Sequence, residues 1–289
     1  MPMNSKTMRM RTFHPEATAW RKAVIANSGT VSATTMRAVS NFCTAISAAG
    51  IRSKFLRLSL MCGNNVAAAC VPLYRGASAT GTQYGSTVDT NNGPFVAEDY
   101  SLSTGLDNGN AKYLDTGLKL GTLKTFGADF DNVHCAAYVR ADTIGPTMGA
   151  YDYNDVFLSN GITLVATNND GFYGNTTPSF LTGENLGGSE HMLFGGGFSL
   201  GFSQAEFTAA STGTFQINAT TLSAFISNNS STSFDAVDQT PFCIFNDSTS
   251  VGDQTLSAYS VGLPMGSNAN RTAFFNAMLA FQTALRRNV

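Results

Sequence analysis

"STGLDNGNAKYLDTGL", residues 103–118, is the stretch of this sequence that decides the fold. Two of its glycines enclose a short run in which apolar and polar side chains alternate. Glycine beside Asn or Asp is typical of tight turns, and alternation is typical of a β-strand. The stretch therefore predicts a turn followed by a short strand.

Short apolar or alternating runs continue through residues 62–265, separated by Gly, Asn and Asp. Many short strands joined by turn residues predict an antiparallel β-sandwich and not a parallel α/β sheet. The runs are "AACVPLY", "NVHCAAYVR", "GITLVAT", "HMLFGGGFSLGF", "GTFQINATTLSAFIS", "PFCIFND" and "LSAYSVG".

Helical patterns flank this region. Residues 15–27 begin with Pro15, and residues 32–50 begin with Ser32, a good N-cap, and carry apolar residues three and four apart. "IRSKFLRLSL", residues 51–60, continues that spacing, and residues 268–287 return to it. We predict a helical module at 1–61 and a sandwich domain at 62–289 that contains a C-terminal helix at 268–287.

Charge divides the chain in the same way. Residues 1–75 hold ten basic side chains against one acid, Glu16, for a formal charge of +9, and the remainder carries −11. The split predicts that the basic end meets an acidic partner. An acidic protein surface is favoured over nucleic acid or an anionic membrane, because no nucleic-acid-binding motif accompanies these residues. A solvated basic face is favoured over either kind of partner taken alone. The docking candidates are Arg9, Arg11, Arg21, Lys22, Arg37, Arg52, Lys54 and Arg57.

Cysteines and targeting signals point to a chain folded in a cytosol. The five cysteines show no C-x-x-C, so their spacing indicates neither a disulfide framework nor a zinc site. Cys62 and Cys70 are the one pair considered for a bridge, with small buried thiols as the preferred interpretation. We find no signal peptide and no apolar run of membrane-spanning length.

Residues for catalysis are not evident, and we predict no catalytic and no cofactor-binding residue. Asp129 with Asp131 and Asp152 with Asp155 are the nearest approach to a carboxylate pair. They could serve hydrolysis or bind Ca²⁺, but solvated loops are the favoured interpretation. His134 precedes Cys135, and strand alternation would place the two on opposite faces, which disfavours a nucleophile and base pair.

Three stretches resemble one family. Residues 103–118 are similar to the G-x-G-x-x-K-Y-L-[ND]-T-G signature of concanavalin A-like, laminin-G-like sandwich proteins of tailed bacteriophages. Residues 17–58 resemble the paired helices that begin those proteins, and "AFQTALRRNV", residues 280–289, resembles their closing "F-Q-T-A-L-G-R-x-V". The resemblance implies a concanavalin A-like jelly roll in which the motif at 109–117 marks the fold. It also implies the roles of the motif residues: Gly109 and Gly117 in the turns, Tyr113 and Leu114 in the sandwich core, and Lys112 and Asp115 at the strand ends. The sequence departs from the family at Arg286-Arg287 and at the junction 61–76.

The resemblance and the charge split together predict a non-enzymatic virion component, assembled in the host cytoplasm: a head fibre, a capsid decoration or a tail-associated subunit. Its expected partners are acidic capsid, portal or tail surfaces, further copies of itself and a host-surface glycan. "FYGNTTPSF", 172–180, and "ISNNSSTSF", 226–234, are the expected exposed tips. The alternatives are a phage polysaccharide depolymerase and a free carbohydrate-binding module.

Overall fold

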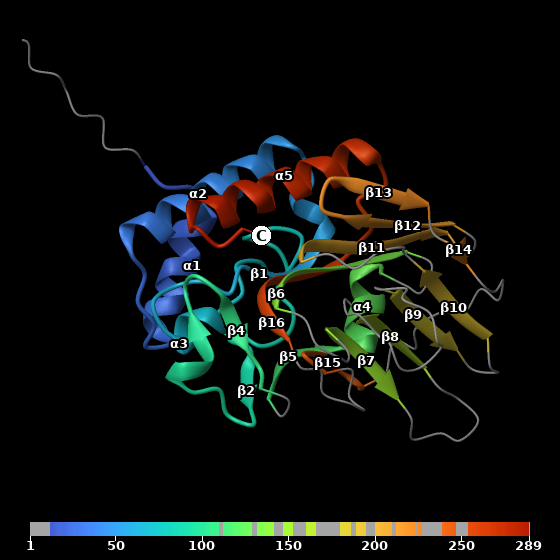
Figure 1. Cartoon of the computed structure of the whole chain (residues 1–289), viewed down its shortest axis with the longest axis horizontal. Coiled ribbons are helices and arrows are strands. Elements are labelled where there is room, and N and C mark those ends of the chain that lie inside the picture. Colours follow the sequence, from blue (N-terminus) through green and yellow to red (C-terminus); the bar gives the residue numbers. More distant parts are fainter. Residues whose placement is uncertain are drawn as a thin grey trace, which may run out of the picture.

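The computed structural model describes residues 12–109, 112–128, 132–141, 147–152, 160–165, 180–185, 189–194, 200–209, 212–223, 225–226, 239–246 and 254–288. Between residues 151 and 194 it describes the path of the backbone. Two helices lead, strands fill the middle of the chain, and a long helix follows the last strand (Figure 1).

Helices form where the sequence supplies their caps. Ser32 accepts a hydrogen bond from the backbone of Thr35 and begins α2, and Ser267 caps α5 in the same way. None of the helices in the described ranges has the length and apolar character needed to cross a bilayer. The helical elements are α1 (Pro15–Ala26), α2 (Ala33–Ala48), η1 (Arg52–Lys54), α3 (Val66–Ala69), η2 (Ala97–Asp99), α4 (Leu120–Phe126) and α5 (Asn268–Ala284).

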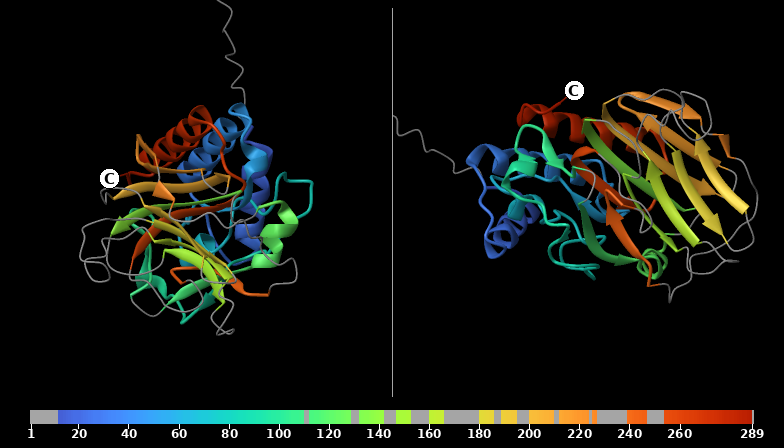
Figure 2. Two further views of the ribbon diagram at one scale, coloured as in Figure 1. Left: turned by 90° about the vertical axis from the view of Figure 1, so that its right-hand side faces the viewer. Right: turned by 60° about the horizontal axis from the view of Figure 1, so that its bottom comes forward.

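Two antiparallel sheets lie face to face (Figure 2). The sheet beside the helices, here the helix-side sheet, has the order β13-β12-β11-β6-β16-β4-β3, with β1 also paired to β16. It consists of β1 (Phe55–Ser59), β3 (Tyr100–Ser101), β4 (Gly105–Asp107), β6 (Val133–Ala141), β11 (Gly201–Ala209), β12 (Thr212–Ile217), β13 (Thr220–Ser223) and β16 (Thr255–Gly262).

The second sheet, here the outer sheet, has the order β14-β10-β9-β8-β7-β15-β5-β2. It consists of β2 (Thr90–Asn92), β5 (Tyr113–Lys119), β7 (Met148–Asp152), β8 (Asn160–Val165), β9 (Phe180–Asn185), β10 (Ser189–Phe194), β14 (Phe225–Ile226) and β15 (Pro241–Ile244). The predicted mainly-β, antiparallel sandwich, preceded by helices and closed by a C-terminal helix, is confirmed.

Strand β6 shows how the layers fit together. Its odd-numbered residues 133–139 belong to the cluster between the two sheets, and its even-numbered residues Ala136 and Tyr138 belong to a cluster under the helices. A strand that is buried on both faces needs apolar residues at successive positions, and "VHCAAYV" supplies them. The molecule therefore has three layers: helices, helix-side sheet and outer sheet.

The helical layer shares one hydrophobic cluster with the sheet below it. Trp20 and Val24 of α1 and Phe281 of α5 belong to the same cluster as Phe202 of β11. Phe274 of α5 packs edge-on against Phe202 with ring centroids 5.1 Å apart. Residues on both sides of the predicted domain boundary at 61 and 62 thus contribute to this cluster.

The spacing of residues 51–60 indicated a helix, but these residues do not form one. They form η1 and then β1, which pairs with β16 from Phe55↔Gly262 to Ser59↔Tyr259. Ile51, Phe55 and Leu58 do reach the cluster under the helices, but Leu56 points into the cluster between the sheets. A register shift between Phe55 and Arg57 lets a strand mimic helical spacing.

The basic pair after α5 separates into one exposed and one buried side chain. Arg286 is exposed and has a left-handed backbone (φ 58°), whereas Arg287 is fully buried. The Arg287 guanidinium donates to the backbone oxygens of Leu60 (2.5 Å), Met61 (3.0 Å) and Ser257 (2.9 Å). It also donates to the Gln282 side chain. Its role is therefore to tie α5 to the sheet.

Replacing Arg287 should destabilise the fold. Arg287→Met keeps most of the side-chain volume but leaves buried carbonyl oxygens without donors, and we expect a loss of about 2–4 kcal/mol in the free energy of unfolding. Urea denaturation followed by circular dichroism measures it. Arg286→Met removes the same charge from an exposed position and should change stability by no more than about 0.5 kcal/mol. Equal stabilities for the two variants would contradict the assignment.

Candidate functional site

The 103–118 stretch contains β4 and most of β5, and several of its polar side chains form hydrogen bonds within the fold. Asn108, which sequence reasoning missed, is fully buried and accepts a hydrogen bond from the Gln254 backbone (2.8 Å). Lys112 lies just before β5 and donates to both carboxylate oxygens of Asp99 at 2.6 Å. Leu114 is buried between the sheets, and Tyr113 packs at the edge of that cluster. These contacts fix the register of two strands.

Gly117 marks a bulge within β5, so Asp115 lies inside the strand and not at its end. Phe242 pairs with Leu118 while Cys243 pairs with Asp115, and Asp115 Oδ1 accepts a hydrogen bond from the Gly117 backbone (2.8 Å). Gly117 has φ +66°, and a Cβ there would lie 2.1 Å from Ser86 Oγ. Glycine is required both by conformation and by space.

Two glycine variants separate these requirements. Gly117→Ala should lower the free energy of unfolding by roughly 3 kcal/mol, because it combines left-handed strain with a steric clash. Gly109→Ala has φ +51° but nothing within 4 Å of the new Cβ, and should cost only about 1 kcal/mol. Thermal or urea denaturation compares them. A Gly109 variant as unstable as the Gly117 variant would contradict this account.

Arg57, one of the docking candidates, lies in the core. Its guanidinium donates to Asp89 Oδ1 (2.5 and 3.0 Å) and to the backbone oxygens of Tyr84 and Ser86, and the Tyr259 hydroxyl donates to Asp89 Oδ2 (2.6 Å). Arg57 and Asp89 have no exposed side-chain surface. Arg57 is therefore removed from any docking surface, because its charge is needed to compensate Asp89.

The other docking candidates are distributed unevenly. Arg21, Lys22 and Arg37 are exposed on α1 and α2, and Lys54 is half-buried in η1. Arg52 is held by Glu16 at 2.7 Å and by the Gly76 backbone oxygen at 2.6 Å, so its charge is largely used within the fold. Arg9 and Arg11 lie outside the described residues.

The helical layer is almost free of acids. Across the full lengths of α1, α2 and α5, Glu16 is the one acidic residue, and it is paired to Arg52. Of the cations in these helices, Arg271 of α5 is bound to the buried carboxylate of Glu206. The exposed cations of α1 and α2 therefore face solvent, and the one acid on these two helices, Glu16, is already paired to Arg52.

The side chains of the acid pairs considered for hydrolysis or Ca²⁺ binding lie outside what the structure describes. Asp129, Asp131 and Asp155 lie outside the described residues, and Asp152 ends β7 in the part described by its backbone path. The solvated-loop interpretation therefore stays a prediction, with hydrolysis and Ca²⁺ binding as its alternatives.

His134 and Cys135 occupy opposite faces of β6, as predicted. His134 lies under the helices, where its Nδ1 meets the Leu263 backbone oxygen (2.7 Å) and its Nε2 meets Ser260 Oγ (3.0 Å). Cys135 lies between the sheets. All five cysteines are buried free thiols, so Cys62 and Cys70 are not bridged.

Burial gives His134 a measurable effect on stability. Removal from water lowers its pKa from 6.5 to about 4, although the Leu263 bond opposes this. Below pH 6.5 the His134 side chain is protonated in the unfolded chain but stays neutral in the folded chain. The free energy of unfolding therefore decreases as the pH falls from 6.5 to about 4. Between pH 7.5 and pH 4.5 the wild type should lose about 2 kcal/mol more than His134→Gln in urea denaturation. Parallel losses in the two proteins would contradict it.

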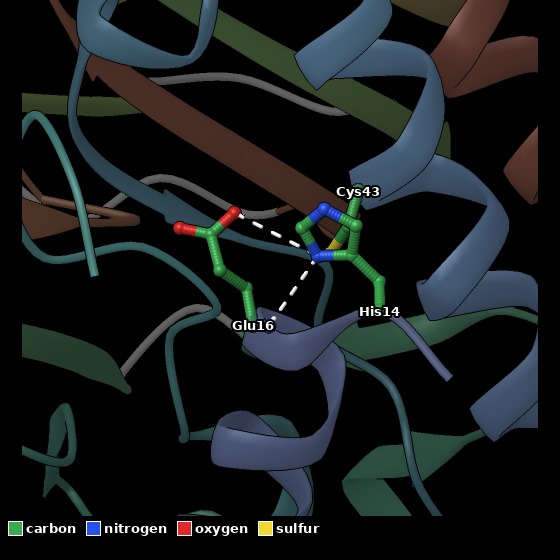
Figure 3. Close-up of side chains that lie close together, drawn as sticks. All are labelled: His14, Glu16 and Cys43. Atoms are coloured by element: carbon green, nitrogen blue, oxygen red, sulfur yellow. Dashed lines mark hydrogen bonds and ion pairs between the residues drawn. The ribbon is translucent and has the colours of Figure 1, made fainter. Parts of the chain in front are cut away.

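A further cluster joins the start of α1 to the middle of α2 (Figure 3). The ligand-type atoms of His14, Glu16 and Cys43 all lie within 4.8 Å of one another. His14 Nδ1 accepts a hydrogen bond from the Glu16 backbone (3.3 Å), so the ring proton resides on Nε2, which faces Ser47 Oγ at 3.4 Å. No sequence motif predicted this group, because its members are drawn together by helix packing.

The surroundings of this cluster are charged on one side and apolar on the other. Arg52 Nε binds Glu16 Oε1, and the guanidinium also stacks 3.7 Å from the centre of the Tyr74 ring. Cys43 has no exposed surface, and burial raises the pKa of its thiol to about 12. A thiol with so high a pKa is not an activated nucleophile.

Two hollows open on the described surface near the helices. The larger, of about 520 Å³, lies beside α3 and β2, but its Asn27, Asp89 and Asn91 side chains bond within the fold. The smaller, of about 180 Å³, is lined by Glu16, Arg52 and neighbours from α1. The larger hollow therefore offers few free polar groups to a ligand, whereas the smaller one reaches the edge of the His14 cluster.

No family model and no curated protein matches this sequence. Similar solved structures include domain 4 of AbnA, an extracellular arabinanase from Geobacillus stearothermophilus, in complex with arabinotriose (14% identity, 65% of this chain, 88% of that chain, TM-score 0.42). A mutant Trypanosoma rangeli sialidase displaying trans-sialidase activity is similar at 10% identity over 84% of this chain and 39% of its own (TM-score 0.42). The enzymatically active domain of bacteriophage CBA120 tailspike protein 2 is similar at 14% identity over 69% of this chain and 32% of its own (TM-score 0.34).

These comparisons correct one expectation. We predicted that the chain is not an enzyme, whereas the similar structures come from an arabinanase, a sialidase and the enzymatically active domain of a tailspike. One of them is a phage protein and one holds a bound arabinose trisaccharide. At these identities and TM-scores the likeness extends to the mainly-β architecture alone.

Proposed function

We propose that this chain is a surface component of a tailed-phage virion, attached through its helical layer and carrying a β-sandwich that recognises a host-surface glycan. The observation that carries the attachment is the exposed basic character of α1 and α2 in a layer whose one acid, Glu16, is already paired. The resemblance of residues 103–118 to the phage sandwich signature supports the virion context.

The geometry favours the helical layer as the attached side. Helices α1, α2 and α5 gather at one side of the molecule, and strands β9, β10 and β14 lie at the opposite end (Figures 1 and 2). Attachment through the helices would turn that far end outward. In the sequence, the expected tips at 172–180 and 226–234 adjoin β9 and β14, and this end is the one proposed for glycan recognition.

The attaching surface would be an acidic face of the capsid, portal or tail. Exposed cations steer such an encounter and are screened by salt, so attachment should weaken as ionic strength rises. Arg21, Lys22 and Arg37 are the described cations to test, because Arg52 and Arg57 are engaged inside the fold.

Charge reversal tests the attachment. Virions assembled with the Arg21→Glu, Lys22→Glu, Arg37→Glu triple variant should carry at least about tenfold less of this protein, since three reversed contacts exceed roughly 1.4 kcal/mol together. Quantitative mass spectrometry of purified virions measures it. The Arg21→Lys, Lys22→Arg, Arg37→Lys variant keeps the charge and should load normally. Full loading of the reversed variant, with an unchanged melting temperature, would refute electrostatic attachment.

The glycan part needs a separate readout. Purified protein is mixed with host-surface polysaccharide, and both retention on the polysaccharide and release of new reducing ends are measured. Retention supports recognition, and reducing-end release identifies a depolymerase acting on the same ligand. Neither signal would remove the glycan from the proposal and leave the attachment to be judged by virion loading.

A further inference from the structure

His14, Glu16 and Cys43 have the chemistry of a transition-metal site. Imidazole nitrogen, carboxylate oxygen and thiolate sulfur are the three donor types that zinc takes in proteins. Their ligand atoms lie within 4.8 Å of one another, whereas a tetrahedral zinc site requires about 3.3–3.8 Å between donors. Closing this gap requires rotation of the His14 and Glu16 side chains, which are 21% and 11% exposed.

The lone pairs needed by a metal are available. Glu16 Oε1 accepts a hydrogen bond from Arg52. The other carboxylate oxygen, Oε2, lies 4.0 Å from His14 Nδ1, and a metal ion between these two atoms can bind both. His14 Nδ1 carries no proton, because it accepts the 3.3 Å bond from the Glu16 backbone, and that long bond is easily exchanged for a metal.

The surrounding residues orient two of these ligands in the way that metal sites require. A ligating histidine usually donates its other N–H to a neighbour, and His14 Nε2 faces Ser47 Oγ. Ligating carboxylates are usually held by a further bond, and Arg52 provides it for Glu16. The backbone N–H of His14 is also fixed, by Ser40 Oγ at 2.8 Å.

An independent observation at the same place is the Tyr74 hydroxyl. It is buried beside the Cys43 thiol, which interacts with it without forming a well-aligned hydrogen bond, and within the described part of the chain no stronger acceptor reaches it. A buried hydroxyl with so weak a partner is uncommon and costly. A thiolate formed on metal binding would accept a hydrogen bond from this hydroxyl, which would satisfy both groups.

We propose that His14 Nδ1, Glu16 Oε2 and Cys43 Sγ bind one zinc ion, with water in the fourth position. The Cys43 S–H bond breaks as the zinc–sulfur bond forms, and the proton leaves to solvent. The ion enters beside His14, whose side chain is 21% exposed, and next to the 180 Å³ hollow lined by Glu16. Bound zinc would clamp the start of α1 to the middle of α2.

Cobalt titration tests the site on the full chain. After treatment with a chelator, the protein should bind one equivalent of Co²⁺ with a near-ultraviolet thiolate charge-transfer band, and Zn²⁺ should abolish the band by displacement. Zn²⁺ at a hundredfold excess over its Kd should raise the melting temperature by roughly 5 °C, reversibly with chelator. No charge-transfer band on saturation with Co²⁺ would overturn the proposal.

Variants assign the ligands. Cys43→Ala should lose the band, and Cys70→Ala, which removes an equally buried thiol outside the cluster, should keep it. His14→Asn preserves a helix-capping side chain and should weaken Co²⁺ affinity at least about tenfold while leaving the fold intact. A band that persists in Cys43→Ala, or an unchanged affinity in His14→Asn, would overturn the assignment.

Discussion

The helix-side sheet must be covered on both faces, and most of this architecture follows from that constraint. β6 places apolar side chains on alternate faces, so one set meets the outer sheet and the other would meet water if α1, α2 and α5 were absent. Exposure of a contiguous apolar sheet face of this size favours aggregation. The helices are therefore required by the sheet, whatever else their outer surface does.

Buried cations connect these layers. Arg57 is matched by the carboxylate of Asp89 between β1 and the following loop, whereas Arg287 is held by backbone oxygens from β16 and from the segment after β1. Taking a guanidinium out of water is costly, and only a full set of acceptors compensates for it. Arg57 and Arg287 are therefore buried where the loss of their acceptors would strongly destabilise the fold, which favours one arrangement of the layers.

The sequence predicts the helices and strands themselves better than the contacts between them. Period and caps located α1, α2 and α5 closely, because those signals are local, and the runs "NVHCAAYVR" and "LSAYSVG" became β6 and β16. Residues 55–59 were misjudged, since a shift in β1 register reproduces helical spacing and only pairing with β16 reveals a strand. Burial of Arg57 and the meeting of His14 with Cys43 depend on contacts between distant segments, which no local pattern encodes. The absence of acids from α2 and α5, by contrast, could be read directly, and it underlies the proposed attachment.

Contacts between the start and the end of the chain can form only late in translation. Met61 is bound by an arginine 226 residues later, and Arg57 meets Tyr259 across 202 residues. The α1 and α2 segments leave the ribosome long before β16 and α5 exist to cover their apolar sides. Native pairing of such distant segments is slow, and exposed apolar helices are prone to association in the interval. The nascent chain is therefore expected to need chaperone protection while its middle strands are being synthesised.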